Sequence, residues 1–303
     1  MKTSFPRPTF LLVFVLLFSF ITRAQTIQDS IKNQVETMDG NEYIGIILNQ
    51  TSESIRLKTE TLGEITIPRS EIRRITQLSA TKSKDGTYWL DNPQATRYFW
   101  APNGYNLKAG EGYYQNVWVL FNQAVVGLTD YFSAGAGVMP LFLFDGAPTP
   151  AWVTAKFSIP VIENRINLGA GALIGTVLGA ENTDNPSFGV VYGISTFGSK
   201  DVNLNVGLGW GFAGGEVADN PTLNVSTSIR TGAKGYFISE NYLIGTPEET
   251  VVIAMIGGRR IIKHAGLDFG VVLPFSKDIN GFIGIPWLGL TIPFGNTSSS
   301  MTR

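Results

Sequence analysis

The chain of 303 residues has no cysteine, which excludes an N-terminal lipid anchor on cysteine, a disulfide framework and a thiol nucleophile. It has one histidine, His264, which falls in a predicted tight turn and away from any serine that it could activate. Histidine, aspartate and glutamate form no cluster with metal-ligand spacing. The sequence therefore predicts no catalytic, cofactor-binding or metal-binding residues, and we do not expect an enzyme.

Charged residues are also scarce, at 16% of the chain against roughly 25% in an ordinary soluble domain. The formal net charge is −1, so no basic surface for nucleic acid is expected. Yet no apolar run after residue 24 approaches the roughly 20 residues that a membrane-spanning helix needs. The composition thus points to a hydrophobic protein without spanning helices.

The N-terminus is the one place with a continuous apolar run, Phe10 to Ile21. Lys2 and Arg7 precede it, and small residues ending at Ala24 follow it. This order is typical of a secretory signal peptide, and we predict cleavage after residue 24. An uncleaved membrane anchor is the alternative.

Most of the remaining chain alternates apolar residues with small or polar ones. In Val202–Phe212 the even-numbered residues are apolar, and the odd-numbered ones are Asn or Gly. A period of two indicates a β-strand, because successive side chains point to opposite faces. An apolar outer face with a small, polar inner face is typical of a strand in a transmembrane β-barrel.

About eleven such runs lie between Tyr113–Val126, which we take as one strand, and Gly281–Phe294. Bacterial barrels have an even number of strands, so the aromatic run Thr96–Trp100 is added as a first strand to give about twelve. Long, acidic, proline-bearing connections alternate with tight turns, which predicts that both ends of the barrel are periplasmic. The fold class is therefore all-β, with an antiparallel transmembrane barrel over residues 96–294.

Residues 25–77 differ from this pattern, because charges are dense and strands are short. Turn signals occur at Asp39-Gly40 and Leu62-Gly63. Strands are expected at Glu42–Asn49, Ser54–Thr59 and Glu64–Pro68, with a closing turn or strand at Glu71–Ile75. This segment resembles the small SH3-like or Sm-like five-stranded barrels. Sm-like domains bind RNA, but the signal peptide predicts a periplasmic location and hence a periplasmic partner. Residues 78–95 are a predicted polar linker, and 295–303 a polar tail.

The last predicted strand carries an assembly motif. Gly289, Ile292 and Phe294 resemble the closing β-signal that the outer-membrane assembly machinery reads, whereas Trp287 and Pro293 depart from it. The run Gly110–Asn116 and the tight turns also resemble those of uncharacterised barrel proteins of Gram-negative outer membranes, and this resemblance spans most of residues 91–294. The resemblance implies the outer-membrane bilayer and the barrel assembly machinery as partners, and it implies no known activity.

Five charged residues are candidates for the lumen. Lys156, Arg230 and Asp268 fall on the inward phase, whereas Glu240 and Arg259 do so for one of two phasings of their strands. The hairpin predicted around Lys263-His264 would place Arg259 opposite Asp268 on the neighbouring strand. These charges either form a constriction that selects solutes or a structural ion network that fills a narrow lumen.

Two functions follow from this pattern. The first is a channel or transporter that passes small solutes through a polar lumen. The alternative is a non-conducting structural or interaction protein, whose barrel anchors the small β-domain near the cell wall. The pattern does not distinguish them, because a fold does not fix a function.

Overall fold

The computed structural model describes residues 32–78, 82–84, 87–89, 92, 94–140, 147–180, 185–246, 249–262, 265–279, 281 and 283–295. The predicted signal peptide, His264 and residues 296–303 lie outside the described residues. Within the described part of the chain, no helix is long and apolar enough to cross a membrane.

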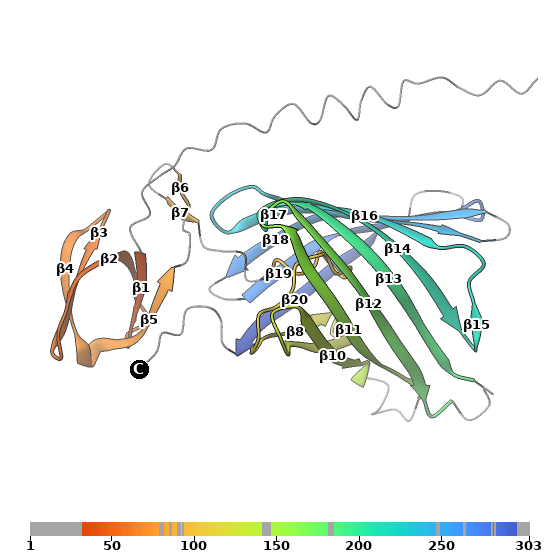
Figure 1. Cartoon of the computed structure of the whole chain (residues 1–303), viewed down its shortest axis with the longest axis horizontal. Coiled ribbons are helices and arrows are strands. Elements are labelled where there is room, and N and C mark those ends of the chain that lie inside the picture. Colours follow the sequence, from red (N-terminus) through yellow and green to blue (C-terminus); the bar gives the residue numbers. More distant parts are fainter. Residues whose placement is uncertain are drawn as a thin grey trace, which may run out of the picture.

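The N-terminal part forms a separate five-stranded antiparallel sheet in the order β4-β3-β2-β1-β5 (Figure 1). A 3-10 helix, Arg69–Glu71, lies between β4 and β5. Val35, Leu57 and Ile67 form the buried core of the five-stranded sheet. The sequence pattern missed the first strand. The strands are β1 (Lys32–Thr37), β2 (Glu42–Gln50), β3 (Ser54–Thr59), β4 (Gly63–Pro68) and β5 (Ile72–Leu78).

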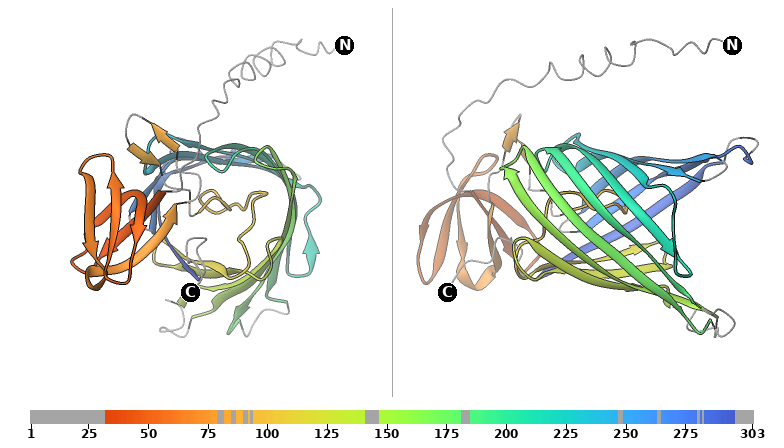
Figure 2. Two further views of the ribbon diagram at one scale, coloured as in Figure 1. Left: turned by 60° about the vertical axis from the view of Figure 1, so that its left-hand side comes forward. Right: turned by 45° about the vertical axis from the view of Figure 1, so that its right-hand side comes forward.

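The segment predicted as a polar linker contains a two-stranded hairpin of β6 (Lys82–Lys84) and β7 (Thr87–Trp89). After it the chain enters a closed barrel of 12 antiparallel strands, in which the last strand pairs with the first (Figures 1 and 2). A short strand, β15 (Glu216–Val217), pairs with the end of β14. The barrel strands are β8 (Glu111–Val117), β9 (Phe121–Gly127), β10 (Phe132–Val138), β11 (Thr149–Ile162), β12 (Ile166–Leu178), β13 (Ser187–Gly198), β14 (Val202–Ala213), β16 (Thr222–Arg230), β17 (Gly235–Gly245), β18 (Thr250–Ile262), β19 (Ala265–Phe275) and β20 (Ile285–Gly295).

The alternation read from the sequence of β14 is present in the structure. Val202 and Trp210 are exposed on the outer face, at 53% and 42% of their surface, whereas Asn203 and Asn205 are buried on the inner face. The same arrangement holds for the other long strands, whose exposed residues are large and apolar. The wall of the barrel thus presents an apolar surface outward and a largely polar one to the lumen.

Two strand assignments made from the sequence are wrong, although their errors cancel in the count. Thr96–Trp100 is not a barrel strand, and the wall begins instead at Glu111. Tyr113–Val126 is not one strand but most of the β8–β9 hairpin. Its three-residue turn places Trp118 and Val119 at φ of 52° and 65°, a left-handed conformation that Asn and Gly usually supply. The turn therefore carries no sequence signal. Because β8 and β9 are two strands joined by this turn, the first and last strands of the barrel, β8 and β20, begin and finish at the end where the tight turns lie.

At the end of the barrel that carries the long loops, one carboxylate links the β17–β18 connection to the β19–β20 connection. Glu249 accepts hydrogen bonds from Ser276 Oγ (2.6 Å) and Lys277 N (2.7 Å). These bonds, the hydroxyl first, lower the pKa of Glu249 below its ordinary value. Because the folded-state pKa is the lower one, the contact stabilises the loops above the unfolded pKa, and its contribution is lost as the pH falls through the folded pKa.

We therefore expect the Lys277 amide to lose protection from hydrogen exchange on acidification below about pH 4, after correction for the intrinsic exchange rate. Glu249→Gln should remove this pH dependence and leave protection in β19 unchanged. Equal pH profiles for the wild type and the variant would contradict the role of Glu249.

Candidate functional site

Residues 94–107 run through the lumen of the barrel, and we call this segment the plug. Figure 2 (left) shows it as the golden trace inside the ring of strands. Tyr98 and Phe99 are fully buried within it. An isolated bridge between Arg97 and Pro102 closes a turn at its centre. The plug adds no strand to the wall, so its position depends on side-chain contacts and on hydrogen bonds from the wall to its backbone.

The first anchor of the plug is a buried ion network on β18 and β19. The register sets Arg259 opposite Asp268, as the sequence pattern predicted. Arg259 Nε and Nη2 donate to the two carboxylate oxygens of Asp268 at 2.5 and 2.9 Å. Arg97 of the plug reaches the same carboxylate at 3.4 Å. Arg259 also donates to the carbonyl oxygens of Gln94 (3.0 Å) and Tyr98 (2.6 Å), so the wall holds the plug backbone directly.

The second anchor is Glu240 on β17, which is fully buried. Its carboxylate accepts the backbone N–H groups of Trp100 (2.9 Å) and Ala101 (3.1 Å) and the hydroxyl of Tyr242 (2.5 Å). Hydrogen bonds to an ionised acceptor are stronger than neutral ones. Glu240 thus fixes the turn at the centre of the plug.

The third anchor is Lys156 on β11. Its ammonium donates to the plug carbonyl oxygens of Tyr105 (2.5 Å), Asn103 (3.1 Å) and Thr96 (3.4 Å). Lys156 is buried, and among the described residues no carboxylate lies within ion-pair distance of its Nζ. Its hydrogen bonds are therefore satisfied while its charge is not neutralised.

The fifth predicted charge, Arg230, sits at the tight-turn end of β16. It donates to Asp201 at 3.0 Å and to the carbonyl oxygens of Gly232 and Ala233. Its guanidinium lies over the ring of Trp89, 5.0 Å from the centroid. The structure thus buries all five predicted charges, and it brings Lys156, Glu240, Arg259 and Asp268 together around the plug.

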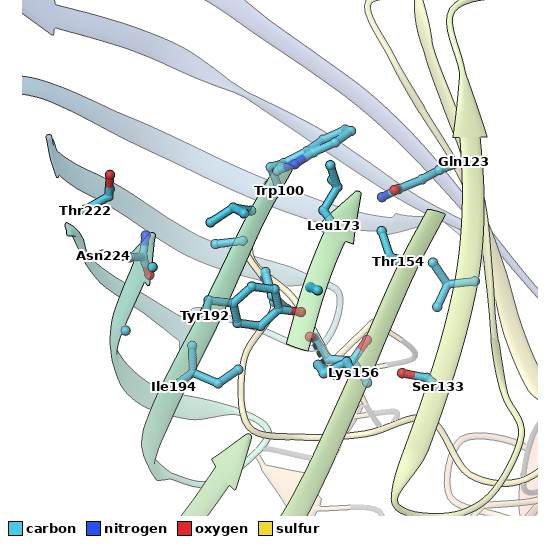
Figure 3. A pocket seen from close by; sticks show the side chains of 18 of the residues that line it. Trp100, Gln123, Ser133, Thr154, Lys156, Leu173, Tyr192, Ile194, Thr222 and Asn224 are labelled. Carbon is cyan, nitrogen blue, oxygen red and sulfur yellow. Dashed lines mark hydrogen bonds between the residues drawn. The ribbon is translucent and has the colours of Figure 1, made fainter. Parts of the chain in front are cut away.

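Beside the plug is a cavity of about 220 Å³, bounded by wall strands from β8 to β17. Figure 3 shows Trp100 of the plug, Tyr192 of β13 and Lys156 of β11 facing it. Its lining is mainly apolar, with Leu173 and Ile194 on the wall. A barrel lumen is ordinarily polar, so an apolar cavity within it is a distinct feature of this protein. An apolar cavity of about 150 Å³ suffices to bind benzene, so a somewhat larger molecule fits here.

The plug and the cavity were not predicted from the sequence. Thr96–Trp100 was assigned to the wall because a short aromatic run fits a strand. The signals against that assignment were Gln94, Arg97 and Asn103, polar residues that follow no period of two, together with the turn-forming Pro102-Asn103-Gly104. Arg97, which completes the ion network, was therefore missed.

Comparison with known proteins gives little further information. No family model matches the chain, and no curated protein matches it. Among solved structures, the chain is similar to the outer-membrane expressed OmpT of Vibrio cholerae, with 10% identity and a TM-score of 0.32. The match covers 88% of this chain and 95% of that one. A likeness of this degree carries no argument about function, which depends on the plug and the cavity themselves.

Proposed function

We propose that the protein is an outer-membrane transport protein for small solutes, whose lumen the plug closes in the state described. The outer-membrane location is supported by the closed barrel and its exposed apolar face. One observation carries the transport proposal. The wall closes through the β20–β8 pairing without any contribution from the plug, so the plug can leave its position while the barrel stays intact.

A solute crossing the opened lumen would pass the side chains that now hold the plug. Lys156, Arg230, Glu240, Arg259 and Asp268 would then line the path, and charges in a narrow path select among solutes. Lys156, Glu240, Arg259 and Asp268 thus act as plug anchors in the closed state and as lumen charges in the open state, whereas Arg230 contacts Asp201 and the β16–β17 turn. Gly289, Ile292 and Phe294 on the closing strand remain our proposal for the signal read by the assembly machinery.

We place the five-stranded sheet of residues 32–78 in the periplasm as an SH3-like module. Its strand order, with β1 between β2 and β5, and its 3-10 helix before β5 support the resemblance. Both ends of the barrel lie at the tight-turn end, which faces the periplasm in outer-membrane barrels. A periplasmic protein is the proposed partner of this module.

Transport can be tested by fixing the plug to the wall. Ser133 Oγ of β10 donates to Asn106 Oδ1 of the plug at 2.9 Å, and the chain has no cysteine to interfere. In Ser133→Cys/Asn106→Cys we expect channel openings in a planar bilayer that vanish on oxidation and return on reduction. Each single-cysteine variant serves as the control and should not respond to oxidant.

The alternative is a non-conducting anchor for the periplasmic module, and the satisfied hydrogen bonding of Glu240 and Arg259 favours it. A folded barrel that never opens, in the wild type or in the reduced double variant, would support the anchor and overturn transport. In that case, deletion of residues 32–78 should abolish capture of the periplasmic partner.

A further inference from the structure

Among the residues that the structure describes, the barrel wall has a notch beside β8, β9 and β10, at the end that carries the long loops. β8, β9 and β10 have 7 residues each, whereas β11 has 14 and β12 has 13. A transmembrane strand needs about 9–11 residues. The β20–β8 register ends at Gly289 opposite Val117, so Ile285–Leu288 extend past the end of β8. Figure 1 shows β8 and β10 ending before the level reached by β12–β14. The floor of the notch is the β8–β9 turn.

This turn is suited to the hydrocarbon core of a bilayer. Its residues are Trp118, Val119 and Leu120, and Val119 is 76% exposed. Asn116 Oδ1 accepts a hydrogen bond from Val119 N (3.2 Å), and Asn122 Nδ2 donates to the carbonyl oxygens of Val119 (3.2 Å) and Leu120 (3.0 Å). The asparagine side chains thus satisfy backbone groups of the turn, as a position in lipid would require.

The side of the notch formed by β20 is satisfied in the same way. Trp118 donates its backbone N–H to Leu288 O (3.0 Å) and its indole N–H to Pro286 O (2.7 Å). These carbonyl groups belong to the part of β20 that extends past β8. An unpaired strand edge is tolerated in a bilayer only when its polar groups have partners. The contacts therefore suit an edge that faces the outer leaflet.

A cluster of aromatic rings separates the notch from the luminal cavity. The ring centroids of Trp118 and Phe121 are 6.0 Å apart, those of Phe121 and Trp100 are 5.9 Å apart, and those of Trp100 and Trp152 are 6.1 Å apart. Trp100 also lines the cavity. Ring contacts of this kind contribute only about 0.5–1.5 kcal/mol each beyond burial, so side-chain rotation can open the path.

The cavity combines an apolar lining with one uncompensated charge. Lys156 lines it, and its ammonium is bonded only to carbonyl oxygens among the described residues. A buried charge is costly unless it has an opposite charge nearby. A ligand with an apolar body and a carboxylate would fill the cavity and supply that charge.

We propose that the notch is a lateral entrance from the outer leaflet of the membrane, through which a small anionic amphiphile reaches the luminal cavity. Its apolar part packs against Leu173, Ile194 and Tyr192, and its carboxylate lies beside Lys156. This assignment deepens the proposed transport function and rests on it for the fate of the ligand, whereas binding and entry are measurable without transport.

The position of the notch is tested with a nitroxide on Val119→Cys, in protein reconstituted into dioleoylphosphatidylcholine vesicles. We expect the label to collide with oxygen and to be shielded from a water-soluble nickel chelate. Lys200→Cys, in a tight turn at the opposite end of the barrel, is the control and should show the reverse. A label at residue 119 that is as accessible to nickel as the control would overturn the lateral entrance.

Binding is tested with tritiated octanoate and tritiated octanol on the full chain in nanodiscs. We expect saturable binding of both to the wild type and at least tenfold weaker octanoate binding to Lys156→Met, with octanol affected less than twofold. Leu173→Trp, which fills the cavity and leaves Lys156 in place, should weaken both. Lys200→Met removes a cation from an exposed tight turn that does not line the cavity, so it is the control and should bind octanoate like the wild type.

The absence of saturable octanoate binding to folded wild type would overturn the ligand assignment, as would unchanged binding by Leu173→Trp. Octanoate binding without any channel opening in the cysteine experiment would overturn transport alone. Channel opening without octanoate binding would overturn this inference alone.

Discussion

Replacing the plug, residues 94–107, with a Gly-Ser linker of equal length should convert a closed barrel into a steadily open pore. Eight-stranded barrels are filled by their own side chains, whereas barrels of 16–18 strands enclose a water channel. A barrel of 12 strands lies between these limits, and here Tyr98 and Phe99 of the plug occupy its interior. We expect at least a tenfold rise in mean conductance in a planar bilayer.

The control for this experiment is deletion of residues 32–78, which removes the small sheet and leaves the plug in place. That variant should stay closed, because the anchors Lys156, Glu240 and Arg259 are all on the barrel wall. Folding of both variants is checked by the heat-dependent shift in gel mobility that is typical of intact barrels. A folded barrel without the plug that fails to conduct would show that wall side chains alone fill the lumen, and transport would be excluded.

The barrel could be predicted from the sequence because its physical cause is local. Each wall residue faces either lipid or the lumen, so strands such as Val202–Phe212 carry a period of two along their whole length. The pairing of Arg259 with Asp268 followed from the same rule and from a short hairpin. Both predictions needed only neighbouring segments of the chain.

The plug could not be predicted in this way, because its conformation depends on residues far away in the sequence. Tyr98 O is held by Arg259, and Trp100 N by Glu240, more than a hundred residues later in the chain. Such contacts leave no period in the segment itself. The β8–β9 turn was not predicted for a related reason. Asparagine side chains and β20 stabilise its backbone, so it contains no glycine that would mark it in the sequence. The cavity exists only once plug and wall are combined.

The second large effect concerns the stability of the buried ion network. Arg97, Arg259 and Asp268 are each at least 97% buried and carry two positive charges and one negative charge. Asp268→Asn would leave two neighbouring guanidinium groups without a carboxylate. Removing one partner of a buried ion pair typically costs about 3–5 kcal/mol, because the remaining charge stays uncompensated. We expect a loss of unfolding free energy in that range.

Arg97→Met should cost less, although it removes the same number of charges from the network. The pair that remains, Arg259 with Asp268, is neutral overall and keeps both of its hydrogen bonds. The variant loses the bonds from Arg97 to the carbonyl oxygens of Tyr98 and Phe99, for which about 1–2 kcal/mol is expected. Urea unfolding of both variants in the same vesicles gives the comparison. If Arg97→Met were the more damaging of the two, the network would act mainly through the backbone of the plug and only weakly through charge balance, because the variant that leaves two unpaired cations would then be the milder one.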